Sequence, residues 1–164
     1  MEIVKRPATR SDSELILTWR NSPSARNVSQ SANELSEAEH AIWFGARIDR
    51  VSTEPFWIMS KGGTDVGFVR LDFSDIKRDS FVVSIFVDPE FRAEGIGKQM
   101  LELALNSVPV KHGISQYRAV IKRDNLGSIK LFESFGFELF MRIDDQFDEY
   151  RMHLTQKDSN APSI

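Results

Sequence analysis

The stretch Val83–Lys98, which reads VSIFVDPEFRAEGIGK, joins an apolar, β-branched run to a glycine-containing turn and then to an amphipathic run. The first part predicts a strand, which ends at Asp88-Pro89-Glu90. The apolar residues from Ile96 onward recur at helical spacing and predict a helix. The stretch therefore predicts a strand, a connector and a helix that begins at a turn with two glycines.

This turn has the features of an anion-binding site. Gly95 and Gly97 carry no side chain to block a ligand, and their N–H groups belong to the first turn, where a helix supplies no acceptors of its own. The positive end of the helix dipole and the cations Arg92 and Lys98 add to the attraction for an anion. The spacing matches neither the three-glycine dinucleotide fingerprint nor a Walker loop. We interpret the turn as a receptor for a diphosphate; the alternative is a plain connecting turn, because two glycines alone are a weak signal.

Outward from this stretch, hydrophobic periodicity predicts an alternation of strands and helices. Tight turns such as Lys61–Thr64 join the middle strands, which should pair antiparallel, whereas the two later crossovers pass through helices, so their strands should run parallel. The order predicts an α+β fold, a mixed and mostly antiparallel sheet of about six to seven strands with helices on both faces. The expected strands are Glu2–Arg6, Pro55–Ser60, Asp65–Phe73, Ser80–Val87, Tyr117–Ile121, Phe137–Ile143 and Glu149–Leu154, and the expected helices are Ser11–Asn21, Ser36–Ile48, Ile96–Val108 and Asn125–Phe135.

Two blocks in register resemble the hallmarks of the GNAT superfamily of N-acetyltransferases. Arg92, Gly95 and Gly97 match that family's pyrophosphate motif, written Arg/Gln-x-x-Gly-x-Gly/Ala, and the preceding Ile85–Pro89 resembles its fourth strand. The segment Asn125–Phe137, NLGSIKLFESFGF, resembles its second hallmark helix. The blocks stand in the family's order and at its usual separation. The resemblance implies a GNAT fold in which the fourth and fifth strands splay apart around acetyl-CoA.

The resemblance also implies which residues bind acetyl-CoA as cosubstrate. The backbone of Ile85–Val87 would pair with the pantetheine arm as an added strand does, and the amides of the glycine turn would hold the pyrophosphate. Asn125 would contact the cofactor from the other side, although it can equally be a helix N-cap. The expected cofactor-binding residues are Ile85, Phe86, Val87, Arg92, Ala93, Glu94, Gly95, Ile96, Gly97, Lys98, Asn125, Ser128 and Phe132.

The groups that move protons are less clearly marked. Many relatives carry tyrosine at the position of Phe132, where it can protonate the departing thiolate; phenylalanine cannot. A thiol has a pKa of about 8.5, so the thiolate is a good leaving group and needs only weak assistance from a general acid. An incoming amine must lose a proton, and the candidate catalytic residues are Ser84 acting through water, Glu39 and His40, with Asp72 and Asp88 as further carboxylates. For each carboxylate the alternative is a solvated or capping role.

The N-terminal helices suggest the acceptor. Their pattern, Trp-Arg-Asn at 19–21 followed by Glu-His-x-x-Trp-Phe at 39–44, resembles GNAT enzymes that acetylate nucleotide-linked amino sugars for bacterial surface glycans, and less closely the ribosomal-protein and peptide N-terminal acetyltransferases. Arginine binds phosphate bidentately and aromatic rings stack on bases, although the same aromatics stand at core-packing spacings. A small amine or lysine acceptor and a non-catalytic acyl-CoA-binding module are the alternatives. The expected substrate-binding residues are Arg20, Asn21, Arg26, Trp43 and Arg70.

Composition limits the remaining possibilities. The chain has 164 residues, 41% of them hydrophobic and 27% charged, which suits one domain over residues 1–154 and a polar, frayed tail over 155–164. The net charge of −3 gives no general attraction for nucleic acid or an acidic membrane. The chain has no cysteine, which excludes disulfides, thiolate zinc sites and cysteine nucleophiles, and we expect no metal. Without an apolar leader the protein is expected in the cytoplasm, with a homodimer left open.

Overall fold

The computed structural model of the chain describes residues 1–74, 76–92, 94–108 and 113–154. The chain divides into two compact units: Met1–Leu71 with Ser84–Asn106, and Asp72–Val83 with Ser107–Ile164. The tail expected over 155–164 and the candidate cofactor residue Ala93 lie outside the described residues. The strand order over the whole sheet is β1-β2-β3-β4-β5-β7-β6, which confirms the predicted mixed, mostly antiparallel architecture.

The first unit is built on an antiparallel sheet. Strand β1 (Ile3–Pro7) pairs with β2 (Phe56–Lys61), which pairs with β3 (Thr64–Phe73). The β2–β3 turn holds two consecutive glycines at φ 58° and 84°, which is the positive-φ pair that a tight hairpin requires. The sequence therefore predicted this hairpin correctly.

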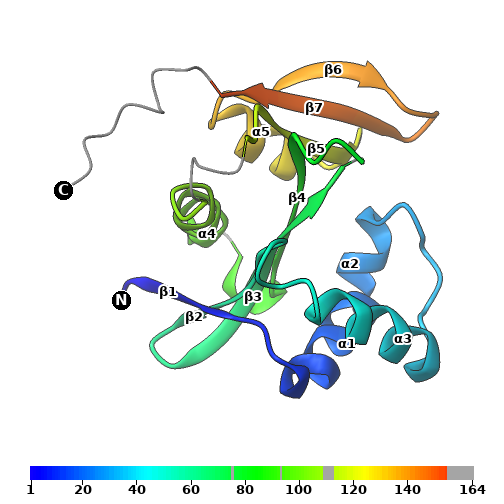
Figure 1. Cartoon of the computed structure of the whole chain (residues 1–164), viewed down its shortest axis with the longest axis vertical. Helices are drawn as coiled ribbons and strands as arrows, with labels where there is room; N and C mark the ends of the chain where they lie inside the picture. Colours follow the sequence, from blue (N-terminus) through cyan, green and yellow to red (C-terminus); the bar gives the residue numbers. More distant parts are fainter. Residues whose placement is uncertain (75, 93, 109–112, 155–164) are drawn as a thin grey trace. The chain divides into compact units, whose positions relative to one another are not determined.

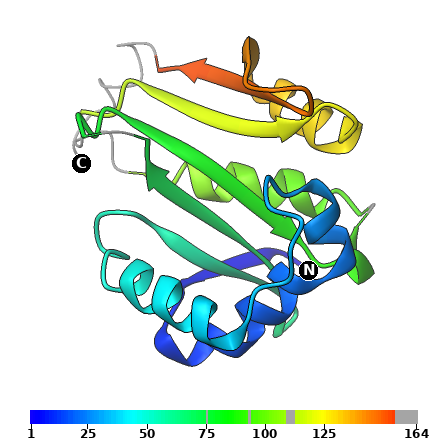
Figure 2. The ribbon, with the colours of Figure 1, turned by 90° about the vertical axis from the view of Figure 1, so that its right-hand side faces the viewer.

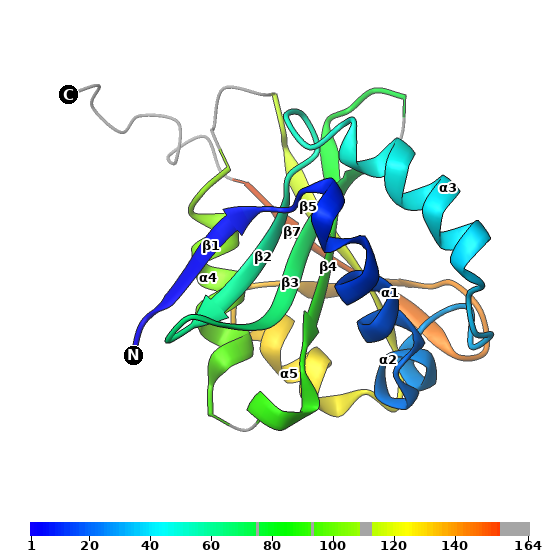
Figure 3. The ribbon, with the colours of Figure 1, turned by 90° about the horizontal axis from the view of Figure 1, so that it is seen from below.

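Helices cover both faces of this sheet (Figures 1 and 3). On one face lie α1 (Ser13–Asn21), a short α2 (Pro23–Val28) and α3 (Glu37–Ile48), and on the other lies α4 (Ile96–Leu105). Burial of α1 and α3 against the strands forms an aromatic-rich core that stabilises this face. Its buried members are Ala8, Ile16, Trp19, Phe44, Ile48, Phe56, Ile58, Phe68 and Phe86.

Two helices differ from the prediction. Ser22 ends α1 as expected but also caps α2, whose first residue is Pro23, so the predicted stop is a break between two helices. Ser36 and Glu39 form the predicted capping box of α3. Helix α4 ends at Leu105 rather than Val108, and the Pro109 that was expected to end it lies outside the described residues.

A close backbone approach fixes the register of β3 against β4 (Ser80–Val87). A Cβ added at Gly67 would lie 2.0 Å from the carbonyl oxygen of Phe86 and 3.0 Å from the Met100 methyl of α4. The N–H of Asp88 donates to the carbonyl of Val66 at 2.8 Å. Position 67 therefore admits only glycine, and the register delivers Phe86 and Asp88 to a fixed place at the end of β4.

The second unit contains β5 (Gln116–Lys122), α5 (Leu126–Glu133), β6 (Glu138–Arg142) and β7 (Phe147–His153) (Figure 2). The start of β4 pairs parallel with β5, from Ser80↔Gln116 to Val82↔Arg118, as predicted for a helical crossover. Strand β6 is not a neighbour of β5, however, because β7 lies between them and runs antiparallel to both. The two strands joined by α5 therefore run in the same direction, as predicted, but they are not paired, because the second strand of the last hairpin lies between them.

Candidate active site

The glycine turn opens directly onto the N-terminus of α4. Gly95 is the N-cap at φ 71° and ψ 12°, a left-handed conformation that favours glycine, and a Cβ there would meet nothing within 4 Å. The first amide that bonds back is that of Gln99, which donates to the carbonyl of Gly95 at 3.2 Å. The amides of Gly97 and Lys98 precede it and are therefore not used by the helix ladder. The space in front of them carries the positive end of the helix dipole.

Asp88 anchors the connector that leads to this turn. Its carboxylate accepts a hydrogen bond from the backbone of Glu90 at 3.0 Å and one from the indole N–H of Trp19 at 3.1 Å. Because Trp19 belongs to the buried core beneath α1, the connector is tied to the interior of the first unit. Asp88 is thus a structural carboxylate here. The sequence marked it only as a strand end and a possible base.

The cations of the turn are more constrained than free surface side chains. The Arg92 guanidinium donates to the carbonyl of Val87 at 3.0 Å and to the hydroxyl of Ser24 at 3.1 Å, so it is held beside α2. Glu94 forms an ion pair with Lys61 at 2.6 Å, and this hydrogen bond lowers the pKa of its carboxyl. Ile96 is buried, whereas Lys98 is exposed. Two hydrogen bonds thus hold Arg92 in place, while its charge remains at the surface.

The side chains at the end of β4 are largely engaged within the first unit. Phe86 points into the core, where its ring stacks on that of Phe68 with centroids 5.7 Å apart. Ile85 and Val87 are half-buried. Ser84 accepts a hydrogen bond from Arg70 at 3.4 Å. The pantetheine contact expected at 85–87 therefore depends on main-chain groups, and it stays a prediction.

In the second unit, α5 begins at Asn125, whose side-chain oxygen accepts a hydrogen bond from the N–H of Ser128 at 3.2 Å. The N-cap role weighed for Asn125 is confirmed. Phe132 is 2% exposed and meets Phe137 edge-on, with ring centroids 5.0 Å apart. The residues of the second hallmark thus include a capped helix start and a buried ring without a hydroxyl.

Three predicted acceptor residues come together in the first unit. The guanidinium carbons of Arg20 and Arg70 lie 4.0 Å and 5.1 Å from the centroid of the Trp43 ring. Burial, and secondarily the charge of Arg70, lowers the pKa of Arg20 to about 10. One terminal nitrogen of Arg20, Nη1, is buried and has no hydrogen-bond partner within the described part of the chain. We call Arg20, Trp43 and Arg70 the arginine–tryptophan cluster.

Two of the three candidate bases adjoin this cluster. His40 is 2% exposed, lies 5.9 Å from the Trp43 ring and pairs through Nε2 with the carbonyl of Ser13 at 2.9 Å. Burial lowers the pKa of His40, and the charge of Arg20 acts in the same direction, so the ring is held neutral. Ser84 reaches the cluster through Arg70.

Glu39, the third candidate base, is an exposed residue engaged in the capping box. Its carboxylate accepts from the Ser36 amide at 2.9 Å and from the Ser36 hydroxyl at 2.8 Å. These bonds lower the pKa of Glu39, which makes it a weaker base. Its place in the structure is explained by capping alone.

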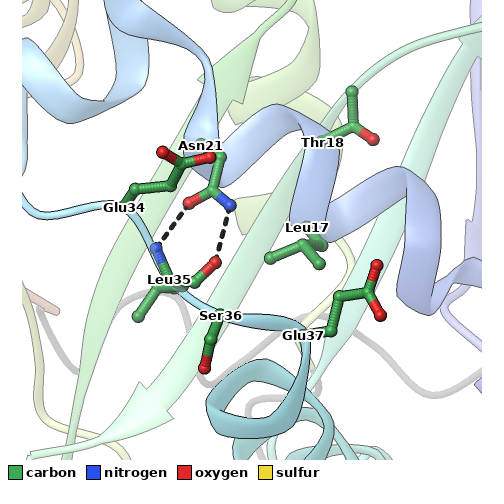
Figure 4. Close-up of a pocket in the computed structure, with 7 residues that line it drawn as sticks. All are labelled: Leu17, Thr18, Asn21, Glu34, Leu35, Ser36 and Glu37. Carbon is green, nitrogen blue, oxygen red and sulfur yellow. Dashed lines mark hydrogen bonds between the residues drawn. The ribbon is translucent and has the colours of Figure 1, made fainter.

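The other two predicted acceptor residues shape the loop before α3. Asn21 donates to the carbonyl of Leu35 and accepts from its N–H, both at 2.9 Å (Figure 4). Arg26 donates to the carbonyl of Ala32 at 3.0 Å. Beside this loop lies an open hollow of about 560 Å³ that sequence reasoning missed, because its carboxylates, Glu34 in the loop and Glu37 at the start of α3, belong to no binding motif. It is lined by Leu17, Thr18, Asn21, Glu34, Leu35, Ser36 and Glu37.

The strand order and the glycine-started helix after β4 are those of the coenzyme A-dependent acyltransferases. The sequence matches the model of the acetyltransferase (GNAT) family over residues 16–137, and the chain belongs to that family. No helix in the described ranges is long and apolar enough to cross a bilayer.

Individual relatives agree with this assignment. The chain is 29% identical over 141 residues to MJ1062 of Methanocaldococcus jannaschii, a match covering 84% of this chain and 28% of that protein. It is 26% identical to the peptidyl-lysine N-acetyltransferase YjaB of Salmonella typhimurium, over 87% of this chain and 88% of that one. The chain thus spans well under half the length of MJ1062, and 45% of a second relative from the same organism, MJ1207.

Solved structures share the fold. A domain from Methanocaldococcus jannaschii superposes with a TM-score of 0.79 at 26% identity, covering 93% of this chain and 99% of that domain. The acetyltransferase yncA of Salmonella typhimurium, solved with its cofactor acetyl-CoA, gives a TM-score of 0.75 at 19% identity and covers 99% of both chains.

Proposed function

We propose that this protein transfers the acetyl group of acetyl-CoA directly to a primary amine. The observation that carries the proposal is the start of α4, where the amides of Gly97 and Lys98 precede the first bond of the helix ladder and the N-cap Gly95 has no side chain to cap them. An oxygen-rich diphosphate fits such a site, because it accepts hydrogen bonds and interacts favourably with the helix dipole. When bound, acetyl-CoA supplies an activated acetyl thioester.

The chain's own residues bind and position the reactants. The amides at the start of α4, with the charge of Arg92, hold the diphosphate, and the main chain of Ile85–Val87 holds the extended pantetheine arm. A backbone N–H at this strand end polarises the thioester carbonyl. These assignments carry the family motif over to the matching residues, and the side chain of Phe86, which stacks on Phe68 in the core, leaves only main-chain groups of that residue for such a contact.

Proton transfer falls to the neighbourhood of the arginine–tryptophan cluster. The amine must attack as a neutral base, and a water held by Ser84 or the Nδ1 atom of His40, which has no partner among the described residues, can take its proton. Burial lowers the pKa of His40 and so makes it a weaker base than an ordinary histidine. Glu39 is the weaker candidate because its carboxylate caps α3. At Phe132 no hydroxyl is present, so water protonates the thiolate in this proposal.

The acceptor class that we propose is a nucleotide-linked amino sugar, as used in surface-glycan biosynthesis. Support comes from the resemblance of segments 17–26 and 37–44 to enzymes of that class. The half-buried Arg20 of α1 and Arg70 of β3 add to it, since they bring two positive charges to one aromatic ring. An acceptor of this kind carries phosphates that two guanidiniums can bind.

A peptide amine is the second candidate, and a specific feature favours it. The hollow between α1 and α3 has Glu34 and Glu37 at its rim and no arginine in its lining (Figure 4). An open acidic hollow suits a cationic peptide rather than a phosphorylated sugar. The peptidyl-lysine N-acetyltransferase YjaB, 26% identical over 87% of this chain, is named for a substrate of that kind.

An acceptor screen with release of the free thiol of CoA separates these possibilities. We expect turnover with acetyl-CoA and a UDP-4-amino-4,6-dideoxy sugar that exceeds turnover with lysine-containing peptides. The reverse order would assign the peptide class instead. Tight acetyl-CoA binding without turnover on any amine would identify a non-catalytic acyl-CoA-binding module and overturn the enzymatic proposal.

A further inference from the structure

We infer that the arginine–tryptophan cluster is an oxyanion-binding subsite that holds a phosphate or carboxylate of the acceptor between Arg20 and Arg70. The inference rests on the proposed acetyl transfer and extends it by naming the group by which the acceptor is recognised. It assigns recognition to charge at Arg20 rather than to aromatic stacking.

The first step is the contrast between Arg20 and the other arginines of the unit. Arg10 pairs with Asp49 at 2.5 Å, Arg26 donates to a loop carbonyl, and Arg47 donates to the carbonyls of Pro55 and Leu71. Arg20 makes no ion pair or hydrogen bond with any described residue, and its Nη1 is buried. Its only described contact of this kind is the face of Trp43, at 4.0 Å. A guanidinium has five N–H donors, so Arg20 is left with donors to offer a ligand.

The second step is the cost of this arrangement to the free protein. Two guanidiniums share one ring, and burial together with the charge of Arg70 raises the cost of keeping Arg20 charged. A buried charge without a counter-charge destabilises a fold, and replacing it by an apolar side chain of similar shape commonly stabilises it. A bound oxyanion beside Arg70 would neutralise the charge of Arg20 and use the donors that Arg20 leaves free. The cluster is therefore built to be completed by an anion.

The third step assigns a role to Trp43. The Arg20 guanidinium lies over the Trp43 ring. The centroids of the Trp43 and His40 rings are 5.9 Å apart. A ring covered by a guanidinium does not offer that face to a sugar or base. Trp43 is thus a positioning residue that sets the direction of the Arg20 fork. Ser84, 3.4 Å from a terminal nitrogen of Arg70, positions the second guanidinium in the same way.

The first experiment measures stability and binding together. The full chain is saturated with CoA, so that the diphosphate site at α4 is filled, and its melting temperature is recorded with UDP, inorganic phosphate, glutarate or uridine. We expect UDP to raise the melting temperature of the wild type and uridine to leave it unchanged. UDP against glutarate then distinguishes phosphate from carboxylate recognition.

The decisive variant is Arg20→Met, which keeps the length of the stem and removes the charge. We expect it to melt at a higher temperature than the wild type without ligand and to lose the UDP-dependent rise. Arg10→Met, which removes a distant exposed arginine, should keep that rise. If Arg20→Met does not fold, Arg20→Gln repeats the test, because glutamine also removes the charge and keeps a polar side chain. A UDP-dependent rise of wild-type size in the variant would overturn the inference.

A kinetic arm separates this inference from the proposed function. We expect Arg20→Met to raise the KM of a phosphorylated amine acceptor by about tenfold or more, with kcat and the KM of acetyl-CoA little changed. Retention of the wild-type KM would count against the subsite even if transfer is confirmed. Conversely, UDP stabilisation of the wild type with no thiol release on any amine would refute acetyl transfer while leaving the oxyanion subsite standing.

Discussion

Helix α4 follows β4 and helix α5 follows β5, and each helix has a glycine as its second residue, Gly97 and Gly127. Their first turns nevertheless differ. At α5, Asn125 accepts from the Ser128 amide at 3.2 Å, and the Leu126 amide donates to Asp124 at 3.0 Å. At α4, the N-cap is Gly95, which has no side chain with which to cap. A helix start that is satisfied by its own residues is structural, and one that is left open can serve a ligand. The contrast lies in the caps, not in the glycine content.

The largest expected effect comes from replacing Gly97 of α4 by a bulky residue, with Gly127, the second residue of α5, as the control position. Gly97→Tyr should abolish acetyl-CoA binding, a loss of about 100-fold or more, because the ring would occupy the space in front of the α4 amides. Gly127→Tyr, the equivalent change at α5, where a Cβ meets nothing within 4 Å, should fold and bind acetyl-CoA far better. Titration calorimetry with acetyl-CoA measures both. Wild-type binding by Gly97→Tyr would show that the diphosphate lies elsewhere.

A smaller effect is expected from the N-cap glycine itself. Gly95→Ala should lower the free energy of unfolding by about 1–2 kcal/mol, since alanine pays a steric cost at φ 71° even though its Cβ has room. Urea denaturation measures this change. An unchanged midpoint would mean that the turn is free to adopt another conformation, and the left-handed start of α4 would then not be a fixed feature.

Removing the N-cap of α5 should lower the free energy of unfolding by about as much as Gly95→Ala does, but for a different reason. Asn125→Ala loses the side-chain acceptor for the Ser128 amide, at about 1 kcal/mol, whereas Asn125→Ser should retain most of the stability because serine caps nearly as well. Acetyl-CoA affinity separates the two roles weighed for Asn125. Restored stability without restored affinity in Asn125→Ser would show that Asn125 also contacts the cofactor.

The smallest expected effect is that of salt. Acetyl-CoA binding at an open helix start with Arg92 and Lys98 nearby should weaken by a few-fold between about 0.05 M and 0.5 M NaCl, because exposed charges are screened. The melting temperature of the cofactor-free chain should change much less over the same range. Salt-independent affinity would indicate that apolar contacts, rather than the dipole and the cations, provide most of the binding.

Local sequence signals predicted the elements of the fold well where one residue type determines the backbone. The glycine pair of the β2–β3 turn, the Ser36–Glu39 capping box and the strand Ser80–Val87 are as expected. The insertion of β7 between β5 and β6 was not predictable in the same way, because a hairpin pattern does not say which edge its second strand joins. Gly67 did carry a signal, since a glycine within a strand indicates a close backbone approach.

The candidate site was predicted unevenly. The motif at 92–98 was readable because its chemistry lies in consecutive backbone groups. The approach of Arg20 and Arg70 to Trp43 joins three distant parts of the chain, so only a list of candidates was available from the sequence. The capture of Arg92 by Ser24, and of Asn21 by the Leu35 backbone, depends on side-chain geometry that no spacing rule encodes.

The hydrogen bond from Trp19 to Asp88 has a practical consequence for protein engineering. It joins the helical segment expected to bind the acceptor amine to the connector that leads to the expected acetyl-CoA site. The two segments are therefore not independent modules. A chimera that takes residues 13–48 from a relative should also import the partner of position 19 at position 88. Grafts that respect this pair should express as folded protein, and grafts that split it should misfold or lose the connector's geometry.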